Sequence, residues 1–253
     1  MLSYPVLVYA AIALLFAGFI RGFSGFGFSM MVMISLSFVL APAEIVPMIL
    51  LWEVLASAWL LPQVWRDVDW ISIGWLLAGV LVGTPIGVYT LTQVPAKPMQ
   101  AIIAVTVIFL IIAVWRGFRI SENVGRAATS GVGVVSGILN GGATIGGPPV
   151  VLFYYSAKNN LKRARASLIA FFLATDLFAA AICASQGLVT TKGLKLTGIL
   201  VIPMVIGLTL GSKSFFNLDQ EVFRRRVMIL FIFLAIVSFF HAVLSMHGNL
   251  MNS

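Results

Sequence analysis

Long apolar stretches separated by short polar links take up most of this chain. They cover roughly residues 5 to 40, 45 to 62, 71 to 92, 99 to 115, 130 to 157, 166 to 185, 196 to 211 and 227 to 246. The hydrocarbon core of a membrane is about 30 Å thick, and one helical crossing takes about 20 apolar residues. The pattern therefore predicts an all-α polytopic membrane protein with about eight membrane segments and no soluble domain.

Composition agrees with a membrane protein and argues against a nucleic-acid partner. Hydrophobic residues make up 60% of the chain and charged residues only 9%, whereas a soluble domain carries about 25% charged residues. The net charge of +8 comes from short Lys and Arg clusters between apolar stretches, which is the pattern of loops on the positive side of a membrane. The first stretch has no Lys or Arg before it, so we expect it to be retained rather than cleaved as a signal peptide.

Two of the stretches are rich in glycine, and each is followed by three ordinary ones. The two halves align at four places in order: Gly18-x3-Gly22 with Gly133-x3-Gly137, Glu53 with Asp176, Gln63 with Gln186, and Gly83-x3-Gly87 with Gly207-x3-Gly211. A single Gly-x3-Gly match means little in a membrane protein, but four ordered matches indicate a duplication. We therefore divide the chain into a first repeat, 1–120, and a second repeat, 121–253.

The distribution of positive charge indicates how the glycine-rich stretches enter the membrane. If all eight stretches cross, 15 of the 16 Lys and Arg residues split nine to six between the two sides, with Arg21 left out. If the glycine-rich stretches dip in and return, the same residues split twelve to three, and the three are Lys97, Lys192 and Lys195. The stronger bias favours two inverted repeats, each a broken or re-entrant segment plus three transmembrane helices. It also places both termini on the outer side.

The glycine-rich segments are the candidate substrate site. Glycine lets backbone N–H groups face a ligand, and a broken helix places a partly positive N-terminus inside the membrane, where an anion is favoured. The fifth stretch carries so many glycines and prolines that we expect no single regular helix there, but unwound or re-entrant backbone. The alternative is close helix packing through small residues. The candidate residues are Arg21, Ser24, Gly25, Gly27, Asn140, Gly141, Gly142, Thr144, Gly146, Gly147 and Pro148.

The second of these segments resembles a known family. Ser136-Gly-Ile-Leu-Asn-Gly-Gly142, running into Ile145-Gly-Gly-Pro-Pro149, is similar to the TauE/SafE transporters, and the resemblance extends to the length and the duplication. It implies export of sulfite, an organosulfonate or another small oxyanion across a bacterial inner membrane, without a cofactor. The first segment departs from the family's triple glycine, since Phe26 separates Gly25 from Gly27. We therefore give the second segment more weight as the substrate site.

Three charged residues fall inside apolar stretches, where charge is costly and often functional. Arg21 adjoins the first glycine-rich segment, and Glu53 and Asp176 occupy matching places in the two halves. Arg21 has two interpretations: it snorkels to the interface, or it pairs with the anionic substrate or with Glu53. The acids either carry protons that are coupled to transport or form hydrogen bonds between helices.

Other polar residues have less specific interpretations. Lys158, Lys162, Arg163 and Arg165 form a cytoplasmic cluster that sets topology and contacts lipid headgroups, or that concentrates anions in a vestibule. Cys183 is the only cysteine, and we expect it to be a buried thiol. His241 and His247 are expected at the membrane interface, so the sequence predicts no metal site.

Other function classes remain open at the level of sequence. An anion channel or an uptake carrier for a small organic anion would need the same features. A remote alternative is an intramembrane serine hydrolase, because Gly22-Phe23-Ser24-Gly25 has the form Gly-x-Ser-Gly and His241 could act as its base. We expect no enzyme activity, a small anionic substrate and the lipid bilayer as partners, and a homodimer as one possible assembly.

Overall fold

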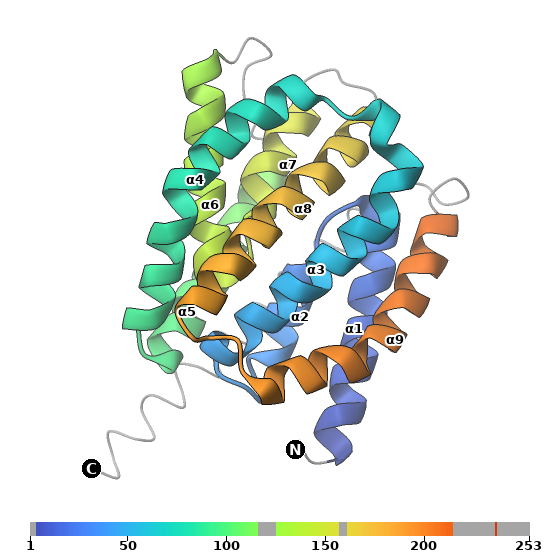
Figure 1. The fold of residues 1–253 in the computed structure, drawn as a ribbon, viewed down its shortest axis with the longest axis vertical. Coiled ribbons are helices and arrows are strands. Elements are labelled where there is room, and N and C mark those ends of the chain that lie inside the picture. The colour runs from blue at the N-terminus through green and yellow to red at the C-terminus, as the bar shows by residue number, and fades with distance from the viewer. Residues whose placement is uncertain (1–3, 116–124, 157–160, 215–235, 237–253) are drawn as a thin grey trace.

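The computed structural model describes residues 4–115, 125–156, 161–214 and 236, and these residues form a bundle of helices without strands (Figure 1). Five of the described helices are long and apolar enough to cross a membrane. The prediction of an all-α polytopic protein is therefore confirmed. Apart from residue 236, the eighth apolar stretch, 227 to 246, lies outside the described residues, as do both histidines. The helices are α1 (Tyr4–Ser24), α2 (Phe28–Leu36), α3 (Pro42–Val64), the short η1 (Trp65–Asp67), α4 (Trp70–Gln93), α5 (Ala96–Trp115), α6 (Arg126–Ala143), α7 (Gly147–Ser156), α8 (Leu161–Ser185) and α9 (Thr191–Ser214).

Both glycine-rich stretches are broken into two helices. The first break joins α1 to α2, and the chain then folds back, since the Tyr9 hydroxyl donates to the Ser35 carbonyl at 2.9 Å. The second break joins α6 to α7 through Thr144, which has a left-handed φ of 56°. Pro148 and Pro149 follow in the first turn of α7, where proline's missing N–H costs little.

As expected, the fifth stretch does not form one regular helix, but unwound backbone is confined to a short part of it. Residues 131–142 are helical within α6, and only 144–146 interrupt the helix. The physical reason is that most of these glycines face another helix, although Gly131 has open space around its Cβ position. A Cβ at Gly133 would overlap the Leu76 carbonyl oxygen of α4, and one at Gly137 would lie 2.9 Å from the Thr84 nitrogen. Tertiary packing thus outweighs the low helix propensity of glycine.

The same kind of contact joins α1 to α9. A Cβ at Gly207 would overlap the Leu15 carbonyl oxygen, and one at Gly22 would overlap the Leu208 carbonyl oxygen. The two backbones therefore approach each other more closely than ordinary side chains allow. We call the α4–α6 and α1–α9 contacts the two glycine seams.

Helices α3 and α8 pack against each other between the seams (Figure 1). Trp52 of α3 is fully buried, and its indole N–H donates to the Thr197 carbonyl of α9 at 3.0 Å. The turn into α4 is fixed by Asp69, whose carboxylate accepts from the Ser72 backbone N–H at 3.3 Å and from the Ser72 hydroxyl at 2.9 Å.

The two broken segments enter the bundle from opposite ends. Helix α1 begins at the end where the N-terminus lies, and α6 begins at the other end (Figure 1). The α4–α5 and α8–α9 links lie at the N-terminal end, and η1 and the start of α8 lie at the opposite end.

Candidate functional site

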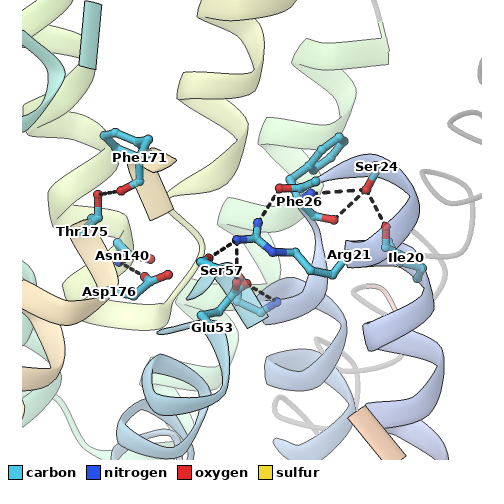
Figure 2. Close-up of polar contacts among 12 residues, drawn as sticks. Ile20, Arg21, Ser24, Phe26, Glu53, Ser57, Asn140, Phe171, Thr175 and Asp176 are labelled. Atoms are coloured by element: carbon cyan, nitrogen blue, oxygen red, sulfur yellow. Dashed lines mark hydrogen bonds and ion pairs between the residues drawn. The ribbon is translucent and has the colours of Figure 1, made fainter. Parts of the chain in front are cut away.

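Arg21 lies at the end of α1, directly before the first break, and its side chain is 0% exposed. Its Nη2 lies 3.1 Å from Glu53 Oε2 and donates to the Ser57 hydroxyl at 2.6 Å (Figure 2). Its Nη1 donates to the Gly25 carbonyl, and the guanidinium lies 4.8 Å from the centre of the Phe172 ring. Arg21 therefore points into the bundle and pairs with Glu53, and the snorkelling interpretation is wrong.

Glu53 connects this guanidinium to the second half of the broken segment. Its side chain is 2% exposed, and its Oε1 accepts from the backbone N–H of Ser29 at 3.3 Å. Ser29 lies in the first turn of α2, where backbone N–H groups lack helical partners and the helix dipole favours negative charge. The carboxylate thus lies between an arginine and a helix N-terminus.

The second break carries a different polar pair. Asn140 Nδ2 donates to Asp176 Oδ1 at 2.7 Å, and both side chains are buried (Figure 2). Among the described residues, Asp176 Oδ2 has no hydrogen-bond partner. Asp176 also lies within electrostatic range of Glu53 and Arg21, so the polar groups of the two breaks form one connected region.

Backbone and hydroxyl groups hold the second break in shape. The Ser136 hydroxyl donates to the Gly146 carbonyl at 2.6 Å, and the Thr144 hydroxyl donates to the Ala143 carbonyl at 2.6 Å. A Cβ at Gly146 would lie 2.6 Å from the Ser136 carbonyl oxygen, so little space remains on that face. Gly147 faces the Phe172 ring.

Four of the predicted site glycines fall into two groups. Gly25 and Gly27 have φ of 79° and 90°, a region that side chains with a Cβ rarely adopt, and they form the first break. Gly141 and Gly142 face α4 instead: a Cβ at Gly141 would lie 3.0 Å from the Val88 nitrogen. The first pair shapes the site, whereas the second pair belongs to a glycine seam.

Ser24 contributes to the first break through its hydroxyl. Its Oγ lies 2.7 Å from the Ile20 carbonyl oxygen and 2.8 Å from that of Phe26, and it accepts from the Phe26 N–H at 3.4 Å. A serine held in this way stabilises a turn. The proposed base of the hydrolase alternative, His241, lies outside the described residues.

Three site residues were not predicted from the sequence. Arg165 was assigned to an exposed cluster, but it is only 7% exposed, and its Nη2 donates to the Gly22 carbonyl beside the first break at 2.7 Å. Ser57 and Phe172 were not singled out. Each lies four residues from a predicted acid, Ser57 after Glu53 and Phe172 before Asp176, so helical spacing could have identified both.

Comparison with known proteins now decides the family. A family model described as sulfite exporter TauE/SafE matches residues 10–238. The chain belongs to the TauE/SafE family. The matched span of the TauE/SafE model contains both breaks and all four buried charged residues of this region. No curated protein and no solved structure gives a significant match. Because TauE/SafE proteins are membrane transporters, this chain is a multi-pass membrane transporter.

Proposed function

We propose that this protein is a secondary carrier that binds a small oxyanion between the two helix breaks and exports it across a bacterial inner membrane. The observation that carries the proposal is the fully buried guanidinium of Arg21 at the first break, next to the N-terminus of α2. Guanidinium and backbone N–H groups are the donors that proteins use for sulfonates, sulfite and carboxylates. Family membership supports sulfite or an organosulfonate as the substrate.

The arrangement of the helices supports inverted repeats and therefore alternating access. A broken pair opens each half, α1–α2 and α6–α7, and two long helices follow it, α3 and α4 or α8 and α9. Helix α1 packs on α9 and α6 packs on α4, so each opening helix contacts the other half in an equivalent way. Repeats that are related in this manner can rock around a central site and open it to either side.

The charge bias supports an orientation with the N-terminal end of the bundle outside. Lys97 lies near the start of α5, and Lys192 and Lys195 lie near the start of α9, all at that end. Arg66, Arg126 and Lys162 lie at the opposite end. In this orientation the cationic end faces the cytoplasm. An inside-negative potential would then favour export of an anion by about 2.3 kcal/mol per charge per 100 mV.

Loss of anion binding when Arg21 is changed tests the proposal. Arg21→Lys keeps the positive charge but loses the planar guanidinium with its paired N–H donors. We expect it to weaken binding of methanesulfonate at least about tenfold. The double variant Arg21→Gln/Glu53→Gln removes both charges together and should abolish binding without leaving a buried charge unpaired. Ligand-induced thermal stabilisation of the purified protein measures both effects. Unchanged binding in both variants would place the site elsewhere.

Transport itself is measured as anion flux in proteoliposomes with a clamped membrane potential. Saturable flux that is lost in Arg21→Lys supports a carrier, whereas flux that rises linearly with concentration indicates a channel. Varying the pH gradient then tests whether Glu53 or Asp176 carries a proton. Flux that ignores the pH gradient in wild type, Glu53→Gln and Asp176→Asn alike would leave both acids with a packing role.

A further inference from the structure

The carboxylate of Glu53 lies where a bound oxyanion would lie. Its two oxygens contact the Ser29 backbone N–H in the first turn of α2 and Arg21 Nη2, at 3.3 Å and 3.1 Å. The Ser57 hydroxyl adjoins the same guanidinium nitrogen at 2.6 Å. A helix N-terminus, a guanidinium and a hydroxyl together make the donor set of an oxyanion site.

The site retains donor capacity with Glu53 in place. Arg21 Nε has no hydrogen-bond partner among the described residues, although the side chain is fully buried. A buried guanidinium normally uses its donors, because an unsatisfied buried donor is unfavourable. One carboxylate therefore does not satisfy this site completely, and a ligand with three oxygens could contact the guanidinium more fully.

Glu53 reaches the site from a third helix. Arg21 belongs to α1 and Ser29 to α2, whereas Glu53 is a side chain of α3 and is not needed to complete either helix of the break. Rotation about its side-chain torsions would withdraw the carboxylate and leave the other donors in place. Glu53 is thus a removable occupant of the donor set.

We propose that Glu53 is a tethered competitor that fills the substrate's own site until a monoanionic oxyanion replaces it. This inference rests on the proposed function and specifies its site. Arg21 supplies one positive charge and Glu53 one negative charge, so a monoanion that replaces the protonated Glu53 carboxyl keeps the site neutral. A dianion such as sulfate would leave one buried negative charge unpaired, which is unfavourable. The ligand class is therefore a sulfonate headgroup, with three oxygens and a single charge.

The charged groups around Glu53 come from few helices. Among the described residues, Arg21 of α1 and Asp176 of α8 act on it directly. Arg165, also on α8, is directed to the Gly22 carbonyl. Lys192 of α9 pairs with Glu44 at the exposed start of α3, and its Nζ lies 3.5 Å from Glu44 Oε2.

A tethered competitor links anion binding to pH. A site that is free only a tenth of the time binds its ligand about tenfold more weakly than the open site does. Protonation of Glu53 removes its attraction to Arg21 and frees the site, so the affinity of wild type for methanesulfonate should rise as pH falls. Methanesulfonate is a suitable probe, because its own charge does not change over the pH series in which Glu53 would be protonated.

The experiment measures methanesulfonate and sulfate binding to the purified full-length protein by titration calorimetry across a pH series. Glu53→Gln is expected to bind methanesulfonate at least about tenfold more tightly than wild type at neutral pH, with an affinity that depends less on pH than that of wild type. The matched control is Glu44→Gln, a second acid of the same helix that is exposed at its start. It should keep the wild-type affinity and the wild-type pH dependence.

Two results would overturn the inference while leaving the proposed function intact. One is an unchanged affinity in Glu53→Gln when Arg21→Lys has lost binding, and the other is tighter binding of sulfate than of methanesulfonate in wild type. Absence of anion binding in every variant and in wild type would overturn both proposals. If Glu53→Gln does not fold, Glu53→Asp replaces it in the experiment. The shorter carboxylate of aspartate reaches Ser29 less well, so methanesulfonate should still bind more tightly than in wild type. Equal or weaker binding of methanesulfonate would refute the role of Glu53 as a competitor.

Discussion

Four charged side chains are buried among the described residues: Arg21, Glu53, Arg165 and Asp176. Burying a charge in a membrane protein is costly unless a partner compensates it. Arg21 and Glu53 compensate each other, and Arg165 is held by a backbone carbonyl at the end of α1. The last carbonyl groups of a helix lack helical partners and attract cations. Both arginines donate to carbonyls near the C-terminal end of α1, and in this way they stabilise the first break.

Arg163 and Arg165 provide a matched pair for testing this role. Arg165→Gln removes a charged donor from a buried carbonyl, and we expect it to destabilise the protein by about 1.5–3 kcal/mol. Arg163 is 54% exposed and pairs with Asp69 at 3.5 Å, so Arg163→Gln should change stability by less than about 1 kcal/mol. Chemical denaturation in detergent micelles measures both changes. Equal losses in the two variants would mean that Arg165 has no special part in the break.

The site was predictable from the sequence where a residue type was out of place. Arg21, Glu53 and Asp176 are charges within apolar stretches, and the structure brings all three into one region. Arg165 was missed because its sequence neighbours are exposed cations, and a charge run does not reveal which member turns inward. The preference for the second segment as the substrate site stays a prediction, and the structure adds a buried arginine at the first break.

At the scale of helices, glycine serves two separate purposes in this chain. Gly25 and Gly27 adopt positive φ and end or begin a helix, whereas the seam glycines stay helical and allow close backbone contact. Glycine content predicted that both segments are special. It could not place the break within the second segment, because the same residue favours both a break and a tight contact.

Two glycines of α9 allow a seam position to be compared with a surface position: Gly207 faces α1, and Gly198 faces open space. Gly207→Ala would place a methyl group against the Leu15 carbonyl, and we expect a loss of about 1–3 kcal/mol from the forced shift of backbone. Gly198 has open space around its Cβ position, so Gly198→Ala should be neutral or stabilise the helix by up to about 1 kcal/mol. Thermal unfolding of the two purified variants provides the comparison. A Gly207→Ala protein as stable as wild type would show that α1 and α9 can move apart freely.

At the scale of the whole molecule, the orientation in the membrane follows from charge. Asp67 and Gln93 flank α4 at its two ends, and both are exposed. In a background with Cys183→Ala, Gln93→Cys should react with an impermeant thiol reagent added outside intact cells, and Asp67→Cys should react only after the membrane is opened. Reactivity of Asp67→Cys alone in intact cells would contradict the proposed orientation.

Each glycine seam joins a helix of the first half to a helix of the second half, and this arrangement also affects synthesis of the chain. A ribosome delivers α1 early, but its seam partner α9 follows only after every other described helix has emerged. Until then the glycine face of α1 has no partner and faces lipid, and α4 waits in the same way for α6. The first half on its own would therefore remain loosely assembled in the bilayer, and it would be a natural target for membrane proteases and chaperones whenever translation stops early.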